Sequence, residues 1–155
     1  MAQANSASNS APSSLSALRA RADYAERVKE VTNRIHAAHD LDELLVSFSA
    51  EILGLFDAER LRLYAIDTEK NELYSRSRDA DKIHEKRLLI SDQSLAGFVA
   101  RHKQTVNITD VYNTDELGQV SPQLAFDRSW DTKAGVRTRQ LLTVPIYDAR
   151  QTLTG

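Results

Sequence analysis

The spacing of the apolar residues changes once along this chain, and that change restricts the possible folds more than any other feature. Between residues 15 and 56 apolar residues recur every three or four positions, whereas after residue 60 most of them lie in short segments with alternating or strand-like character. The first period is that of an amphipathic helix, and the second is that of a half-buried strand. A helical part followed mainly by short strands predicts an α+β domain with an antiparallel sheet.

The first helix is expected at residues 15–39. Residues 1–14 are small and polar, and they predict a disordered tail because they have nothing to bury against a core. The helix is amphipathic, so its stripe fits packing on its own domain as well as pairing between two copies of the chain. The apolar stripe consists of Leu15, Leu18, Ala22, Ala25, Val28, Val31, Ile35 and Ala38.

Residues 40–155 are expected to form one domain. Asp40 and Glu43 have capping-box spacing, so a second helix is predicted to start near Leu41 and to end at about residues 54–57. Residues 109–139 show little pattern and predict a long flexible connection, which in compact domains is usually functional or disordered. Strands are predicted at residues 60–66, 72–78, 86–90, 105–108 and 140–147, with a hairpin turn at 67–71, and a short helix at residues 92–102 has Ser91 or Ser94 as its N-cap.

The charge and the cysteine content exclude several classes of function. The chain carries 20 Lys and Arg against 22 Asp and Glu, so no overall field favours nucleic acid or an anionic membrane. It contains no cysteine, which excludes disulfides, thiol catalysis and thiolate metal sites. The sequence has no phosphate-binding GxxxxGK[ST] loop, no export signal and no apolar run of about 20 residues. We therefore expect a cytoplasmic, non-catalytic chain that neither binds nucleic acid nor inserts directly into a membrane.

Two patterns in the second half of the chain carry a family resemblance. Residues 94–100 read SLAGFVA and residues 106–110 read VNITD, and a second pattern runs from Phe126 through Asp131 and Gly135 to LLTVPI at residues 141–146. Together they resemble the core of GAF domains, and the resemblance covers about residues 41–155. The residues of the two patterns are most similar to those of GAF domains fused to type II secretion or type IV pilus-assembly ATPases and of GAF domains in cyclic-nucleotide phosphodiesterases.

This resemblance implies a central antiparallel sheet with flanking helices and a small-molecule pocket. It also implies that the last strand and helix of the domain lie beyond Gly155. No protein cofactor is expected, and the ligand implied is a cyclic nucleotide or another small metabolite. The alternative is a vestigial pocket that binds no ligand. In that reading Trp130 fills the space as part of the core, and Asp131 caps the turn before Gly135. The implied ligand-binding residues are Leu95 and Ala96 at the start of the short helix, Asp127, Trp130, Asp131, Ala134 and Thr138 in the connecting segment, and Arg62, Arg78 and Asp79 on the sheet side.

Two further groups of side chains are candidate sites. His36 and His39 are three residues apart on the first helix, but no carboxylate or thiol set at ligand spacing accompanies them, so no metal site is expected. A basic group in the connecting segment fits contact with a phosphate or an acidic partner, or else a solvated loop. It consists of Arg128, Lys133, Arg137 and Arg139.

The sequence thus favours a regulatory sensor. In this reading a small ligand or a partner orders residues 109–139, and the first helix transmits the change to a fused effector such as a secretion or pilus ATPase. The alternative is a ligand-free dimerisation and docking platform. In both readings the first helix is expected to form a homodimer.

Overall fold

The computed structural model describes residues 14–37, 49–56, 58–79 and 82–155. The chain divides into two compact units, residues 1–61 and residues 62–155. Residues 1–13 of the expected tail at 1–14 and the expected start of the second helix near Leu41 lie outside the described residues, whereas Ser14 is the first residue of α1 and not part of a tail. All strands and the candidate site belong to the second unit.

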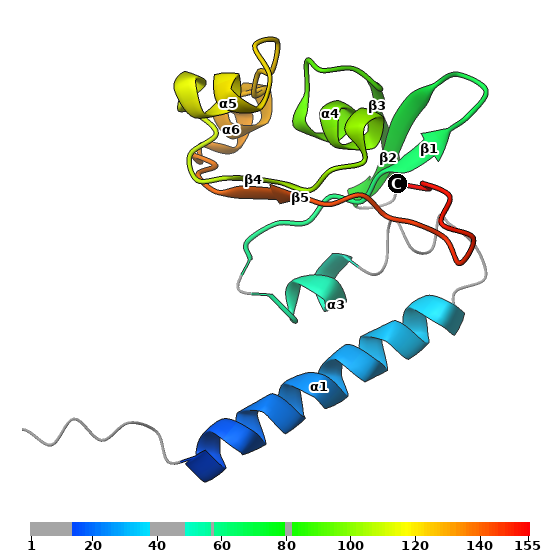
Figure 1. Ribbon diagram of the computed structural model, residues 1–155, viewed down its shortest axis with the longest axis vertical. Helices are drawn as coiled ribbons and strands as arrows, with labels where there is room; N and C mark the ends of the chain where they lie inside the picture. Colours follow the sequence, from blue (N-terminus) through cyan, green and yellow to red (C-terminus); the bar gives the residue numbers. More distant parts are fainter. Residues whose placement is uncertain (1–13, 38–48, 57, 80–81) are drawn as a thin grey trace, which may run out of the picture. The chain divides into compact units, whose positions relative to one another are not determined.

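The first unit is helical, as the apolar spacing predicted. Helix α1 spans Ser14–Ala37 and α3 spans Ser49–Leu53, so the predicted end of the second helix near residue 54 is confirmed (Figure 1). An ion pair of 2.6 Å between Arg34 Nη2 and Glu51 Oε1 joins the two helices. In the part of the chain that the structure describes, no helix is both long enough and apolar enough to cross a bilayer.

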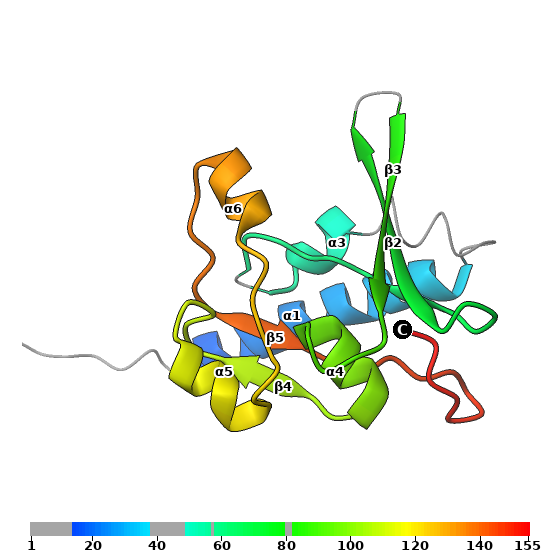
Figure 2. The ribbon, with the colours of Figure 1, turned by 90° about the horizontal axis from the view of Figure 1, so that it is seen from above.

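The second unit begins with a three-stranded antiparallel sheet in the order β1-β2-β3. Its strands are β1 (Ala65–Asp67), β2 (Glu72–Asp79) and β3 (Lys82–Leu89). In Figure 2, β2 and β3 run side by side well beyond β1. Strand β1 is shorter than predicted, because its pairing with β2 stops at Ala65 opposite Tyr74. Strand β3 starts four residues before the predicted position.

A network of charges across the strands explains why β3 extends so far without an apolar pattern. The Arg87 guanidinium contacts the carboxylates of Asp67, Glu72 and Glu85 at 2.8, 3.1 and 2.7 Å. Arg76 Nε lies 3.0 Å from Glu85 Oε2, and these two residues are directly opposite in the register. Opposite charges facing each other on neighbouring strands stabilise the pairing. The hairpin therefore depends on cross-strand ion pairs, which apolar periodicity does not detect.

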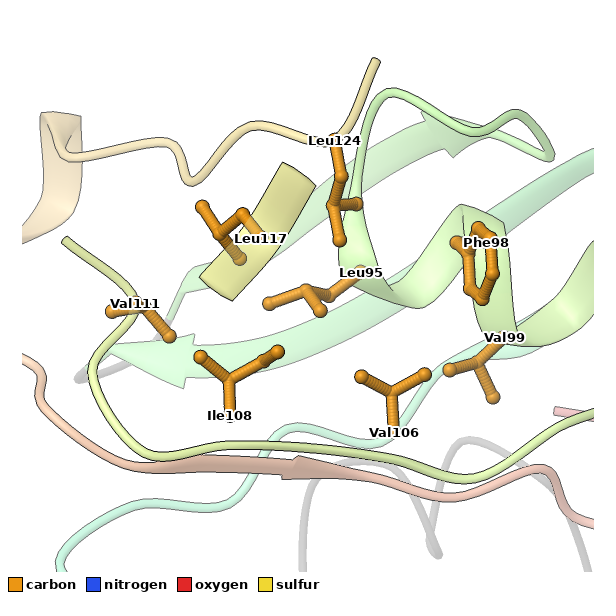
Figure 3. Close-up of a cluster of buried hydrophobic side chains, with 8 residues drawn as sticks. All are labelled: Leu95, Phe98, Val99, Val106, Ile108, Val111, Leu117 and Leu124. Carbon is orange, nitrogen blue, oxygen red and sulfur yellow. The ribbon is translucent and has the colours of Figure 1, made fainter. Parts of the chain in front are cut away.

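The remaining elements include those that form the apolar core. They are α4 (Leu95–His102), β4 (Val106–Ile108), α5 (Thr114–Val120), α6 (Ser129–Ala134) and β5 (Leu141–Thr143), with β4 and β5 paired antiparallel. Figure 3 shows side chains from α4, β4, α5 and the adjoining loops converging. The core residues are Leu95, Phe98, Val99, Val106, Ile108, Val111, Leu117 and Leu124.

Helix α4 confirms the predicted short helix and decides between its two candidate N-caps. Ser94 is the N-cap, and its Oγ accepts a hydrogen bond from the Gly97 N–H at 3.1 Å. The apolar positions predicted from the spacing lie in the core, whereas His102 contacts Asp92 at 2.8 Å. The local sequence was therefore sufficient to place this helix.

Residues 109–139 are not the irregular connection that the sequence predicted, because they contain α5 and α6. Helix α5 is capped by Asn113, whose Oδ1 accepts hydrogen bonds from the Asp115 and Glu116 N–H groups at 3.0 and 3.2 Å. An Asn followed three residues later by Glu is a helix-start signal, so the evidence for α5 was present in the sequence. Helix α6 is only six residues long, too short for apolar spacing to show it.

The last residues of the chain link the two groups of strands. The Ile66 N–H donates to the Thr154 carbonyl at 3.0 Å, and the Thr154 N–H donates to the Ile146 carbonyl at 2.8 Å. The predicted strand at 140–147 is regular only as far as Thr143, two residues before Pro145, which has no N–H to donate. Hydrogen bonds through residues 152–155 therefore connect β1 with the continuation of β5.

Candidate functional site

A buried carboxylate holds the end of the 109–139 segment. The Asp131 side chain is on α6, and the residue is only 2% exposed. Its Oδ2 accepts hydrogen bonds from the Thr138 N–H at 2.6 Å and from the Tyr112 hydroxyl at 3.1 Å, and its Oδ1 accepts one from the Thr138 hydroxyl at 2.7 Å. We call these three residues the Asp131 cluster. It brings together two residues that the resemblance implied for the ligand site, Asp131 and Thr138.

The expected capping of the turn before Gly135 by Asp131 involves its backbone and not its carboxylate. Its backbone carbonyl accepts hydrogen bonds from the N–H groups of Gly135 and Val136. Gly135 has a φ of 65°, the left-handed conformation that glycine adopts at the ends of helices. The turn is therefore capped by the backbone, which leaves the carboxylate for Tyr112 and Thr138.

The ring of Tyr112 supports two arginine side chains. Arg128 Cζ lies 4.4 Å from the ring centroid, and Arg137 Cζ lies 4.8 Å from it. Arg137 also contacts Asp110, with 2.8 Å between Nη2 and Oδ2. Burial raises the pKa of the Tyr112 hydroxyl, and its hydrogen bond to the Asp131 carboxylate raises that pKa further. The hydroxyl therefore stays protonated near neutral pH and donates to Asp131.

The start of the segment is fixed by Glu116 on α5. Its two carboxylate oxygens accept hydrogen bonds from the N–H groups of Thr109 and Asp110 at 2.6 and 3.0 Å. These two backbone bonds are the main reason why the pKa of Glu116 is lowered. The segment is thus attached to the apolar core at its beginning and through the Asp131 cluster at its end.

A second group of polar residues connects the segment to the sheet. Lys86 Nζ on β3 lies 3.4 Å from Asp127 Oδ2, and Asp127 Oδ1 accepts a hydrogen bond from the Ser129 N–H at 3.0 Å. Burial raises the pKa of Tyr64, while the charge of Arg62 lowers it and that of Asp127 raises it. The ion pair places the implied site residue Asp127 against β3, whereas the implied residue Arg62 is exposed ahead of β1.

The other implied site residues lie in different surroundings. Leu95 belongs to the apolar core, Ala96 is half-buried, and Ala134 is exposed at the end of α6. Trp130 is 40% exposed, so the reading in which it fills the pocket as core is wrong. Arg78 and Asp79 are the last two residues of β2, paired with Ile83 and Lys82.

Sequence reasoning missed the residues that organise the site, namely Tyr112, Lys86 and Glu116. Glu116 had a signal, because it follows the N-cap Asn113 by three residues. The other two were not identifiable from local patterns, since each contacts a residue more than 15 positions away.

Histidine and carboxylate side chains do not gather as a metal site in the described part of the chain. No group of three or more such residues is placed there to hold an ion. His36 is exposed on α1, and His39 lies outside the described residues.

The lowered pKa values predict a loss of stability in acid. Hydrogen bonds, mainly to arginines, lower the pKa values of Asp67 and Glu85, and hydrogen bonds to backbone or side-chain donors lower those of Glu116 and Asp127. A carboxylate whose pKa is lower in the folded state stabilises the fold fully above its unfolded pKa, which is about 4. That stabilisation is lost as the pH falls through the lower folded values. We expect a nearly constant melting temperature between about pH 5 and pH 7 and a fall below about pH 4.

Thermal unfolding followed by circular dichroism between pH 7 and pH 3 measures this effect. Glu116→Gln is the informative variant, because it removes one titrating group and should flatten the acid limb of the curve. A melting temperature that is unchanged at pH 3 in the unmodified chain would contradict the prediction.

Comparisons with known proteins agree with this architecture. No protein-family model matches the chain. A solved structure of the GAF domain from a phosphoenolpyruvate-protein phosphotransferase (ptsP) of Coxiella burnetii is similar, with a TM-score of 0.61 and 16% sequence identity. The match covers 84% of this chain and 73% of that one. At this identity the likeness establishes the fold alone, so the expected α+β fold of GAF type, preceded by a long helix, is confirmed.

Proposed function

We propose that this chain is a non-catalytic regulatory sensor module. A small ligand, a nucleotide or another metabolite, binds beside residues 109–139 and changes how firmly their second half is held. A fused or docked effector, for example a secretion or pilus-assembly ATPase, responds to that change.

The observation that carries this proposal is the unequal attachment of the two halves of the segment. Residues 111–124 contribute Val111, Leu117 and Leu124 to the apolar core. Between residues 127 and 139, in contrast, Asp131 alone is buried, and Thr138 is half-buried. The second half is thus held mainly by polar bonds, which include the Asp131 cluster and a bond of 3.0 Å between the Val111 N–H and the Arg139 carbonyl. Such a part can open without exposing the core, as ligand-binding loops commonly do.

A second observation favours the docking alternative. Leu15 and Leu18 on α1 are 58% and 60% exposed. Exposed apolar residues at helical spacing fit the interface of a helix pair between two copies. In this alternative the chain dimerises through α1 and presents the second unit to a partner without any ligand.

Two measurements test the sensor proposal. In a thermal-shift screen of cyclic mononucleotides, cyclic dinucleotides, other nucleotides and small metabolites, a ligand at about 100 times its dissociation constant adds about 2.7 kcal/mol of stability. We expect such a ligand to slow hydrogen exchange at the Val136 and Thr138 amides, both of which bond to Asp131. Amides at the end of α4, such as Lys103, serve as the internal control.

The outcomes separate the two functions. A ligand that raises the melting temperature but leaves exchange at Val136 and Thr138 unchanged would contradict the sensor mechanism. A screen without any binder, together with a dimer that is lost when residues 1–39 are deleted, would favour the docking platform.

A further inference from the structure

Among the residues that the structure describes, a tyrosine ring with two guanidinium groups near it occurs at Tyr74 and at Tyr112, and the two differ in charge balance. On the sheet, Arg76 Cζ and Arg87 Cζ lie 5.4 and 5.5 Å from the centroid of Tyr74. Both guanidiniums are neutralised there, because Arg76 contacts Glu85 and Arg87 contacts three carboxylates. The positive charges at Tyr74 are therefore balanced by carboxylates of the same chain.

The arrangement at Tyr112 has fewer acidic partners. Arg137 is paired with Asp110, but Arg128 forms no ion pair with any carboxylate of the residues that the structure describes. The nearby acids are already engaged. Asp127 contacts Lys86 and the Ser129 N–H, and the Asp131 carboxylate is buried among its three hydrogen bonds.

Arg128 is also held in place. Its guanidinium lies over the Tyr112 ring, and its backbone carbonyl accepts bonds of 3.0 Å from both the N–H and the hydroxyl of Thr132. An arginine that is positioned on an aromatic face loses little side-chain freedom when it binds an anion. Arg137 also contacts this ring, but its charge is paired with Asp110, so Arg128 is the guanidinium at Tyr112 that is available to an anion.

We propose that Arg128, positioned on Tyr112, binds the anionic group of the ligand, a carboxylate or a phosphate on a small molecule. The guanidinium of Arg128 donates paired hydrogen bonds to two oxygens of that group. This inference rests on the proposed sensor function and adds the chemical class of the ligand. It also places the contact at the start of α6, in the part of the segment that polar bonds hold.

The test uses the fluorescence of Trp130, the only tryptophan in the chain, which is two residues from Arg128. The chain is titrated with inorganic phosphate and, separately, with glutarate, and sodium chloride at equal ionic strength is the control. We expect a saturable change with at least one of the two anions and none with chloride. In Arg128→Gln the affinity should fall by about tenfold or more, because a charged hydrogen-bond pair is lost. Arg76→Gln, the matched change at Tyr74, should leave the affinity unchanged.

Four results would overturn the inference. The first is a fluorescence change that does not saturate or that chloride reproduces, and the second is equal affinity in Arg128→Gln. The third is a response to poly-glutamate without any response to phosphate or glutarate, which would assign the surface to an acidic protein partner. A neutral ligand that protects the Thr138 amide in both the unmodified chain and Arg128→Gln would overturn this inference and leave the sensor function standing. Anion binding without any change in hydrogen exchange at the Thr138 amide would contradict the sensor function and leave this inference standing.

Discussion

Gly97→Ala is expected to destabilise the domain by about 3 kcal/mol, since there is no room for a methyl group at this position. A Cβ atom at Gly97 would lie 2.6 Å from the carbonyl oxygens of Leu89 and Ser91 and 2.9 Å from the Ser91 nitrogen. All three atoms belong to the backbone, so no side chain can rotate away to make space. Either α4 moves away from the end of β3, or the loop that carries the N-cap Ser94 shifts, and both changes disturb the core.

The matched control is Gly118→Ala in α5. A Cβ atom there would have no neighbour within 4 Å. Replacing a glycine inside a helix by alanine then stabilises by about 0.5 to 1 kcal/mol through helix propensity. For a domain of this size, thermal unfolding should therefore show a fall of roughly 10 °C for Gly97→Ala and a small rise for Gly118→Ala. Equal melting temperatures in the two variants would refute the close packing of α4 on the loop after β3.

The sequence predicted best where a local pattern and the burial of an element agree. Helix α4 has its cap, its apolar face and its close-packed glycine within ten residues, so its position could be predicted and its N-cap narrowed to Ser91 or Ser94. Strand β3 shows the opposite case. Its first four residues are placed by their pairing with β2, with Glu85 opposite Arg76, and the alternation of apolar residues is absent there.

The candidate site was predicted in part. The resemblance named Asp131 and Thr138, and the structure joins them in one hydrogen-bonded cluster. The resemblance did not name Tyr112, whose hydroxyl donates to Asp131, 19 positions away in the sequence, and whose ring contacts Arg128. Contacts of this kind depend on how α6 folds back toward the start of α5. No local pattern encodes that arrangement, and only the three-dimensional structure provides it.

Asp131→Ala is expected to release the second half of the segment while the core stays folded. The variant removes the acceptor of three hydrogen bonds, from the Thr138 N–H, the Thr138 hydroxyl and the Tyr112 hydroxyl. Leaving buried donors without an acceptor and losing bonds to a charged group costs about 3 kcal/mol in the free energy that keeps the segment closed. The apolar core lies among α4, β4 and α5 and loses nothing directly.

Limited proteolysis measures this opening well, because trypsin cuts after basic residues and the segment carries Arg128, Lys133, Arg137 and Arg139. When opening is fast, cleavage follows the population of the open form, so 3 kcal/mol corresponds to roughly 100-fold faster cleavage. Asp131→Asn separates geometry from charge. Its amide oxygen can accept from the Thr138 N–H and from Tyr112, while its amide nitrogen donates to the Thr138 hydroxyl, so every bond keeps a partner and only the charge is lost. We expect Asp131→Asn to be cleaved much more slowly than Asp131→Ala. If Asp131→Ala instead resists trypsin as well as the unmodified chain does, the buried carboxylate does not hold the segment, and the sensor mechanism loses its structural basis.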